Sequence, residues 1–72
     1  MKWYAHINDV DSFAGKYNIL VTELIELEDG TFNGDLILEF DYQAEKRDGR
    51  FVSGNRLRYE VEREVRNRLD VS

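Results

Sequence analysis

His6, Ser12, Ser53 and Ser72 are the side chains of this sequence best suited to acid–base or nucleophilic chemistry. A serine nucleophile needs a base within hydrogen-bonding reach, and His6 is the single imidazole in the chain. The sequence has no cysteine, which excludes a thiolate nucleophile, a disulfide and a cysteine-based zinc or iron–sulfur site. We therefore predict that the chain is not an enzyme and has no catalytic residue. We interpret His6 as a partly exposed strand residue.

Two segments resemble ligand-binding loops in part. Residues 29–35 have the oxygen-bearing side chains and the glycine, Gly34, that begin a calcium-binding EF-hand loop. The twelfth position of such a loop is a glutamate that binds the ion through both oxygens, and here it is Phe40. Gly49 and Gly54 have the spacing of a phosphate-binding loop but lack the Lys-Ser/Thr pair that completes it. The sequence therefore predicts no metal and no cofactor.

Charge is distributed unevenly along the chain. The 72 residues include 15 acids and 10 lysines or arginines, which gives a net charge of −5. Residues 1–45 carry a net charge of −8 and residues 46–72 a net charge of +3, and no basic residue lies between Tyr17 and Glu45. Such segregation indicates that two surfaces have different functions.

Alternating hydrophobicity predicts a β-hairpin over residues 17–45. Apolar side chains occupy odd positions in the first half of this segment and even positions in the second half. Asp29-Gly30 is a favoured two-residue turn, and with it the numbers of paired residues sum to 59. A competing turn at Asn33-Gly34 would make the sum 67, which changes the partners but leaves the same side chains on the same faces. The predicted apolar pairs are Leu27 with Phe32, Val21 with Leu38, Ile19 with Phe40 and Tyr17 with Tyr42. Glu23 falls on the apolar face opposite Leu36, which indicates a bulge or an edge.

Shorter elements are predicted before the hairpin. Residues 2–7 alternate as a short strand. Asn8 can cap a helical turn over residues 9–14, and Gly15 can terminate this turn.

After the hairpin, Asp48-Gly49 predicts a second tight turn that returns a short strand over residues 50–52. Residues 56–69 fit both a strand and a helix, because their apolar residues recur at spacings of two and of four. We predict a helix, because the segment is long, rich in Glu and Arg, and places opposite charges four residues apart. These charge pairs are Arg56/Glu60, Arg58/Glu62, Glu62/Arg66 and Glu64/Arg68.

The predicted fold class is α+β. A small antiparallel β-sheet, made of the central hairpin of about residues 17–45 and short flanking strands, packs against a C-terminal α-helix. Residues 1–72 form a single domain, with an acidic sheet half over 1–45 and a basic turn and amphipathic helix over 46–72. Tyr59 lies off the apolar stripe of the helix.

The hairpin face turned away from the helix is predicted to be acidic. Alternate residues of a strand lie about 6.7 Å apart, which is near twice the spacing of phosphates along one DNA strand. A rigid strand can therefore imitate a row of phosphates. The predicted partner-binding residues are Glu26, Glu28, Asp35, Glu39, Asp41 and Glu45. Candidate contacts with a partner or with a second copy are Leu20, Leu24, Ile37 and Tyr59.

Two other interpretations stay open. Arg56, Arg58, Arg63 and Arg66 could contact phosphates, which would make the chain a nucleic-acid-binding or transcription-regulatory domain. This interpretation is less favoured, because glutamates lie among the arginines and an acidic chain is repelled by a polyanion. The chain could also be a structural or assembly subunit whose acidic face only keeps it in solution.

No apolar run is long enough to span a membrane, so we predict a cytoplasmic protein without a membrane partner.

In size, acidity, lack of cysteine and layout of charge, the chain resembles the small phage-encoded host-takeover proteins that inhibit host DNA-binding proteins by mimicking DNA. These proteins share no sequence motif, so the resemblance transfers no individual residue. It implies a basic host target, such as a nucleoid-associated protein or a nucleic-acid-guided defence complex. It also implies a homodimer, in which two acidic sheets form a longer track of phosphate-like charges.

Overall fold

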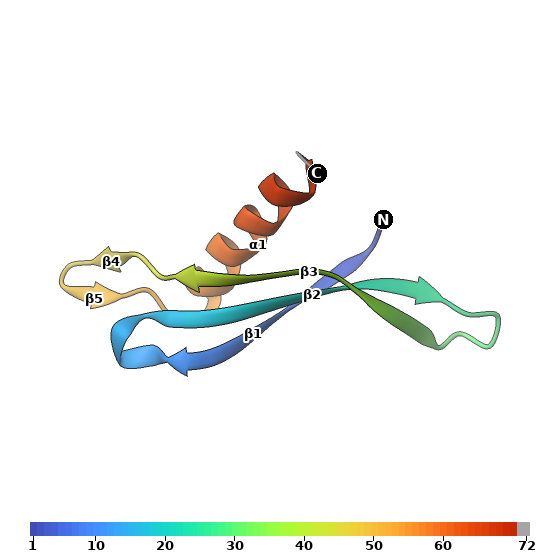
Figure 1. Cartoon of the computed structure of the whole chain (residues 1–72), viewed down its shortest axis with the longest axis horizontal. Coiled ribbons are helices and arrows are strands. Elements are labelled where there is room, and N and C mark those ends of the chain that lie inside the picture. Colours follow the sequence, from blue (N-terminus) through green and yellow to red (C-terminus); the bar gives the residue numbers. More distant parts are fainter. Residues whose placement is uncertain (71–72) are drawn as a thin grey trace.

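The computed structural model describes residues 1–70, so the candidate serine Ser72 lies outside the described part. The elements in chain order are β1 (Trp3–Asp11), the 3-10 helix η1 (Ser12–Ala14), β2 (Lys16–Glu26), β3 (Phe32–Gln43), β4 (Lys46–Arg47), β5 (Arg50–Phe51) and α1 (Gly54–Asp70). β1, β2 and β3 form an antiparallel sheet in that order, and β4 pairs with β5 in a separate ladder. Helix α1 packs on one side of the larger sheet (Figure 1), which confirms the predicted α+β class.

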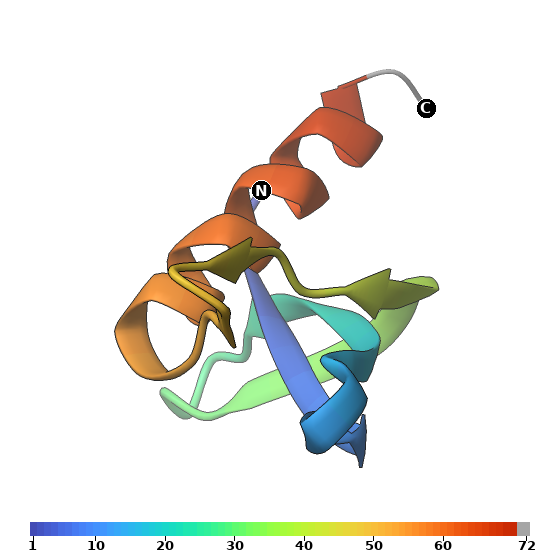
Figure 2. The ribbon, with the colours of Figure 1, turned by 90° about the vertical axis from the view of Figure 1, so that its left-hand side faces the viewer.

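The core lies between α1 and the sheet face that α1 covers, here called the inner face. Ile19 and Val21 of β2 and Val61 and Val65 of α1 are completely buried. The helix crosses above the strands (Figure 2), and its apolar residues recur every four positions, as predicted. Burying each of these side chains stabilises the fold by about 1.5–3 kcal/mol. Residues 56–69, which fitted both a strand and a helix, therefore lie in a helix, and the spacing of four reflects the one helix face that is buried.

The register between β2 and β3 changes part of the way along the hairpin. Three predicted pairs are confirmed, namely Tyr17 with Tyr42, Ile19 with Phe40 and Val21 with Leu38. The next pair is Thr22 with Leu36, so Ile37 is an extra residue in a β-bulge. The bulge lies beside Glu23, the residue whose position had indicated an irregularity.

The predicted two-residue turn is wrong, because the loop is one residue longer. The Leu27 N–H donates to the Thr31 carbonyl oxygen at 2.7 Å, and the Gly30 N–H donates to the Leu27 carbonyl oxygen at 3.0 Å. Gly30 has a φ of 85°, as expected at the last position of a three-residue loop. The longer loop shifts the register by one residue, so Glu26 rather than Leu27 pairs with Phe32. The bulge at Ile37 reverses the shift, and the pairs in the core keep the predicted register.

Beyond the bulge, residues 22–36 of the hairpin form an extension that we call the arm. The last pair that β1 makes is Trp3 with Glu23, and the arm beyond it has only two strands. The arm extends past the end of α1 (Figure 1) and gives the molecule a longest dimension of 48 Å. Phe32 and Leu36, which were predicted to face the core, are 54% and 57% exposed. That prediction is wrong, because the shifted register turns both side chains to the opposite face.

The predictions for the N-terminal segment are correct only in part. The first strand is longer than expected and continues to Asp11. The helical turn is shorter, and Asp11 caps it through its carboxylate, which accepts from the Ala14 N–H at 3.3 Å. The prediction of Asn8 as the cap is therefore wrong, because Asn8 is still paired within the sheet. Gly15 ends the turn with a φ of 69°, as predicted.

The predictions for the C-terminal half are largely confirmed. Asp48 and Gly49 both have positive φ values, 52° and 78°, between the short strands β4 and β5. Three predicted helical ion pairs are present, with N–O distances of 2.9–3.4 Å, whereas the ion pairs found within residues 1–70 do not include Glu62 with Arg66. Within the same residues, no helix has the length and apolar composition needed to cross a membrane.

Candidate protein-binding face

The sheet face turned away from α1, here called the outer face, brings two acids of β3 together. Glu39 pairs with Leu20 and Asp41 pairs with Asn18, so the two carboxylates are alternate residues on one strand. The Asn18 amide donates to the Glu39 Oε2 at 3.4 Å and to the Asp41 Oδ1 at 3.3 Å. One neutral amide therefore holds both carboxylates in place without cancelling their charge.

The other predicted acids take three different positions. Glu26 ends β2 in the arm, on the same face as Leu24, and Glu28 lies in the loop at the tip of the arm. Glu45 follows β3 and forms an ion pair with Arg47 at 3.9 Å. These positions continue the acidic surface from the outer face to the tip of the arm but leave Glu45 partly neutralised.

Asp35 does not share the outer face, so that part of the prediction is wrong. It pairs directly with Glu23, whose side chain alternates with the inner-facing Val21. The physical reason is the bulge, because one extra residue reverses the direction of every side chain of β3 beyond it.

The apolar centre of the outer face also differs from the prediction. Leu20 and Leu24 lie there and are half-buried, as expected for strand residues beside neighbours. Ile37 does not lie there, because the bulge turns it inward and it packs against the core. Leu36 takes its place on the outer face. The position of Glu23 opposite Leu36 in the predicted register was the signal from which this exchange could have been found.

The acids of the sheet and the acids of the helix differ in how they are neutralised. Every ion pair within residues 1–70 uses Glu45, Glu60, Glu62 or Glu64. The seven acids from Glu23 to Asp41 form none. The negative charge of the outer face and arm is therefore available to a partner.

The loop acid Asp29 is held in its charged form. Its carboxylate accepts from the Thr31 hydroxyl at 2.6 Å and from the Thr31 N–H at 3.0 Å. These hydrogen bonds, the hydroxyl bond first, lower the pKa of Asp29 from its ordinary value of 3.8. The tip of the arm consequently keeps its negative charge in mildly acidic solution.

The arginines proposed for nucleic-acid binding are not equally accessible. Arg58 donates to the Ala5 carbonyl oxygen at 3.2 Å and also pairs with Glu62, and Arg56 pairs with Glu60. Arg63 is exposed on α1, as is Arg66. The four residues therefore do not form one continuous basic surface.

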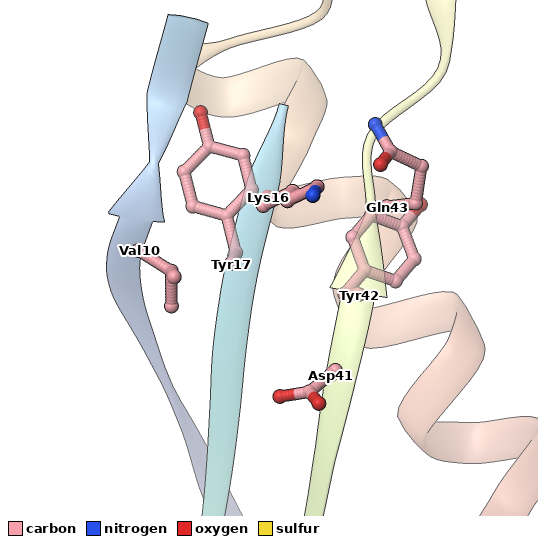
Figure 3. Close-up of a pocket in the computed structure, with 6 residues that line it drawn as sticks. All are labelled: Val10, Lys16, Tyr17, Asp41, Tyr42 and Gln43. Carbon is pink, nitrogen blue, oxygen red and sulfur yellow. The ribbon is translucent and has the colours of Figure 1, made fainter. Parts of the chain in front are cut away.

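A hollow of about 380 Å³ lies at the edge of the sheet where β1 and β3 end and β2 begins (Figure 3). The residues that line it are Val10, Lys16, Tyr17, Asp41, Tyr42 and Gln43. Lys16 and Asp41 are its charged groups, and its lining includes no histidine or serine.

His6 lies on the outer face, where its ring meets that of Tyr4 edge-on at 4.7 Å and its Nε2 is 3.4 Å from the Thr22 hydroxyl. It is exposed and sits on a strand, as predicted. Across residues 1–70, no three His, Asp or Glu side chains are grouped so that they could hold a metal ion.

Comparisons with protein-family models, with curated proteins and with solved structures found no match to this chain.

Proposed function

We propose that this chain is a non-enzymatic acidic module that binds a basic surface of another protein. In this proposal it acts as a phage-type inhibitor in the host cytoplasm and occupies the DNA-binding surface of a host protein, for example a nucleoid-associated protein. The outer face takes the place of the DNA backbone.

One observation carries this proposal. Glu39 and Asp41 lie side by side on an exposed strand face, and no acid from Glu23 to Asp41 has a cation partner, although the helix of the same chain carries several arginines. A face that only needed to stay in solution would be more stable with charges of both signs. The half-buried Leu20 and Leu24 beside these acids would add contact area, while the charges would steer the encounter.

The test measures binding to a purified bacterial nucleoid-associated protein across a salt series, with and without duplex DNA as competitor. We expect binding to weaken at least about tenfold between about 50 and 200 mM salt, because it depends on charge. Duplex DNA should displace the chain. Detectable binding of the chain itself to DNA or RNA at low salt would instead favour the arginine alternative.

A pair of matched variants separates the outer face from bulk charge. Glu39→Lys with Asp41→Lys should abolish binding, whereas Asp9→Lys with Asp70→Lys makes the same change in net charge at exposed positions away from this face and should largely retain it. Equal losses in the two variants, or no binding by the wild type to basic DNA-binding proteins, would refute the proposal. Circular dichroism checks that both variants fold.

A further inference from the structure

The inner face of the arm is a surface that the chain itself does not cover. It continues the face on which α1 packs, but the helix does not reach it (Figure 1). Ile25 and Leu27 lie on this side and are 41% and 45% exposed. The arm therefore presents apolar side chains where the rest of the sheet has a helix above it.

The same surface contains two carboxylates that face each other. Glu23 and Asp35 are direct cross-strand partners in the β2–β3 ladder, and neither forms an ion pair within residues 1–70. Like charges directly opposite each other on neighbouring strands are destabilising. A cation supplied from outside the arm would remove this repulsion.

The outward side of α1 has the complementary charge. Tyr59, Arg63 and Arg66 follow each other at helical spacing on the side opposite the buried residues Leu57, Val61 and Val65. Tyr59 is 53% exposed, and the ion pairs within residues 1–70 include neither Arg63 nor Arg66. We call these three residues the outward stripe.

The arm and the outward stripe cannot meet within one copy. The stripe faces away from its own sheet, and the arm extends away from its own helix along the 48 Å axis of the molecule. We propose that two copies of the chain form a two-fold symmetric dimer, in which the outward stripe of each copy lies on the inner face of the arm of the other.

This arrangement has three layers, because each helix lies between its own sheet and the arm of the partner. Arg63 and Arg66 of one copy meet Glu23 and Asp35 of the other, and Tyr59 packs against Ile25 and Leu27. The two contacts are identical, as the symmetry of a homodimer requires. The outer face points away from the dimer contact, so the dimer does not depend on the proposed function.

The test uses analytical ultracentrifugation at about 100 µM, well above the micromolar dissociation constants of modest interfaces. The wild type should sediment at twice the monomer mass of 8.5 kDa and should dissociate as salt rises. Glu23→Lys with Asp35→Lys should weaken the dimer at least about 100-fold, and Arg63→Glu with Arg66→Glu should do the same, because each replaces attraction by repulsion. Both variants change exposed or half-buried side chains, and circular dichroism checks their folding.

Mixing the two variants provides the decisive measurement. In the mixed dimer, the lysine-bearing arm of one copy meets the glutamate-bearing stripe of the other. The second contact joins the unchanged arm to the unchanged stripe, so the dimer should re-form. The matched control, E39K/D41K, changes the net charge as much as E23K/D35K and should remain dimeric. A monomeric wild type, variants that stay dimeric, or a mixture that stays monomeric would each overturn the proposal. None of these results affects binding to a basic partner protein, which is measured separately.

Discussion

The arm and the rest of the hairpin, residues 16–21 and 37–43, here called the covered half, are made by the same two strands, yet their surroundings differ. In the covered half, α1 packs on the inner face of the sheet (Figure 1), and Ile19 and Val21 of β2 are completely buried. Within residues 1–70, no helix lies above the strands of the arm, and Ile25 and Leu27 on its inner face are 41% and 45% exposed. Both halves place apolar side chains on the inner face, so an apolar residue in these strands is not buried unless another element covers it.

The length of the covering helix decides it. Helix α1 has 17 residues and the hairpin strands have 11 and 12, but a helix advances less per residue than a strand does. The helix is therefore shorter than the hairpin and covers only part of it. A two-stranded ribbon by itself is only marginally stable in water. The apolar and acidic side chains of the arm therefore contribute little to its own folding, which is why we interpret the arm as a binding surface.

The largest expected effect comes from making one substitution in both halves of β2. Ile19→Ala should lower the free energy of unfolding by about 2–5 kcal/mol, because it leaves a cavity beneath α1. Ile25→Ala should lower it by about 0.5 kcal/mol or less, because the side chain is already exposed. Urea unfolding of both variants in dilute solution measures the difference. Similar losses would contradict the division of the hairpin into a covered half and an arm.

This division could be predicted only in part from the sequence. The α+β class and the helix followed from local patterns, because burial imposes a period of two or four on Ile19, Val61 and their neighbours. Asp48-Gly49 followed from turn chemistry. These features depend on residues that lie close together in the chain.

The side-chain directions in the arm could not be predicted in the same way. They depend on two irregularities, the three-residue loop at Gly30 and the bulge at Ile37, and the second hides the effect of the first on the core pairs. A uniform register that keeps the core pairs assigns Asp35 and Ile37 to the wrong faces. The predicted side-chain directions on β3 are therefore correct at Glu39 and Asp41, which lie on the core side of the bulge, and wrong at Ile37 and Asp35.

A smaller effect is expected at the opposite end of the covered half, where Glu60 connects α1 to β4. Its carboxylate is buried and pairs with Arg56 at 3.2 Å and with Arg47 at 3.6 Å. Glu60→Gln should cost about 1–3 kcal/mol, because it removes a charged hydrogen-bond acceptor while both arginines remain half-exposed and can be rehydrated. Glu62→Gln is the matched control and should cost about 0.5 kcal/mol or less, because its pair with Arg58 is more exposed.

Tyr42 gives this variant a second readout. Burial, followed by the negative charge of Glu60, raises the pKa of Tyr42 above its ordinary value of 10.0. The folded state therefore keeps a proton that the unfolded state releases above pH 10, and this contribution to stability is lost as the pH rises through the folded pKa. In E60Q, Tyr42 should ionise at a lower pH than in the wild type, as followed by tyrosinate absorbance. An unchanged titration would mean that Glu60 does not act on this end of the sheet.

The smallest effect is expected at the tip of the arm. Deleting Glu28 leaves Asp29-Gly30 as a two-residue loop between Leu27 and Thr31, which already bond to each other. Both residues tolerate the positive φ of such a loop, so the register on either side should be unchanged and the free energy of unfolding should change by about 0.5 kcal/mol or less. Cross-strand nuclear Overhauser effects between Ile25 and Asn33 would verify the pairing. A larger loss would show that the arm depends on its loop, including the hydrogen bonds from Thr31 to Asp29, as strongly as the covered half depends on α1.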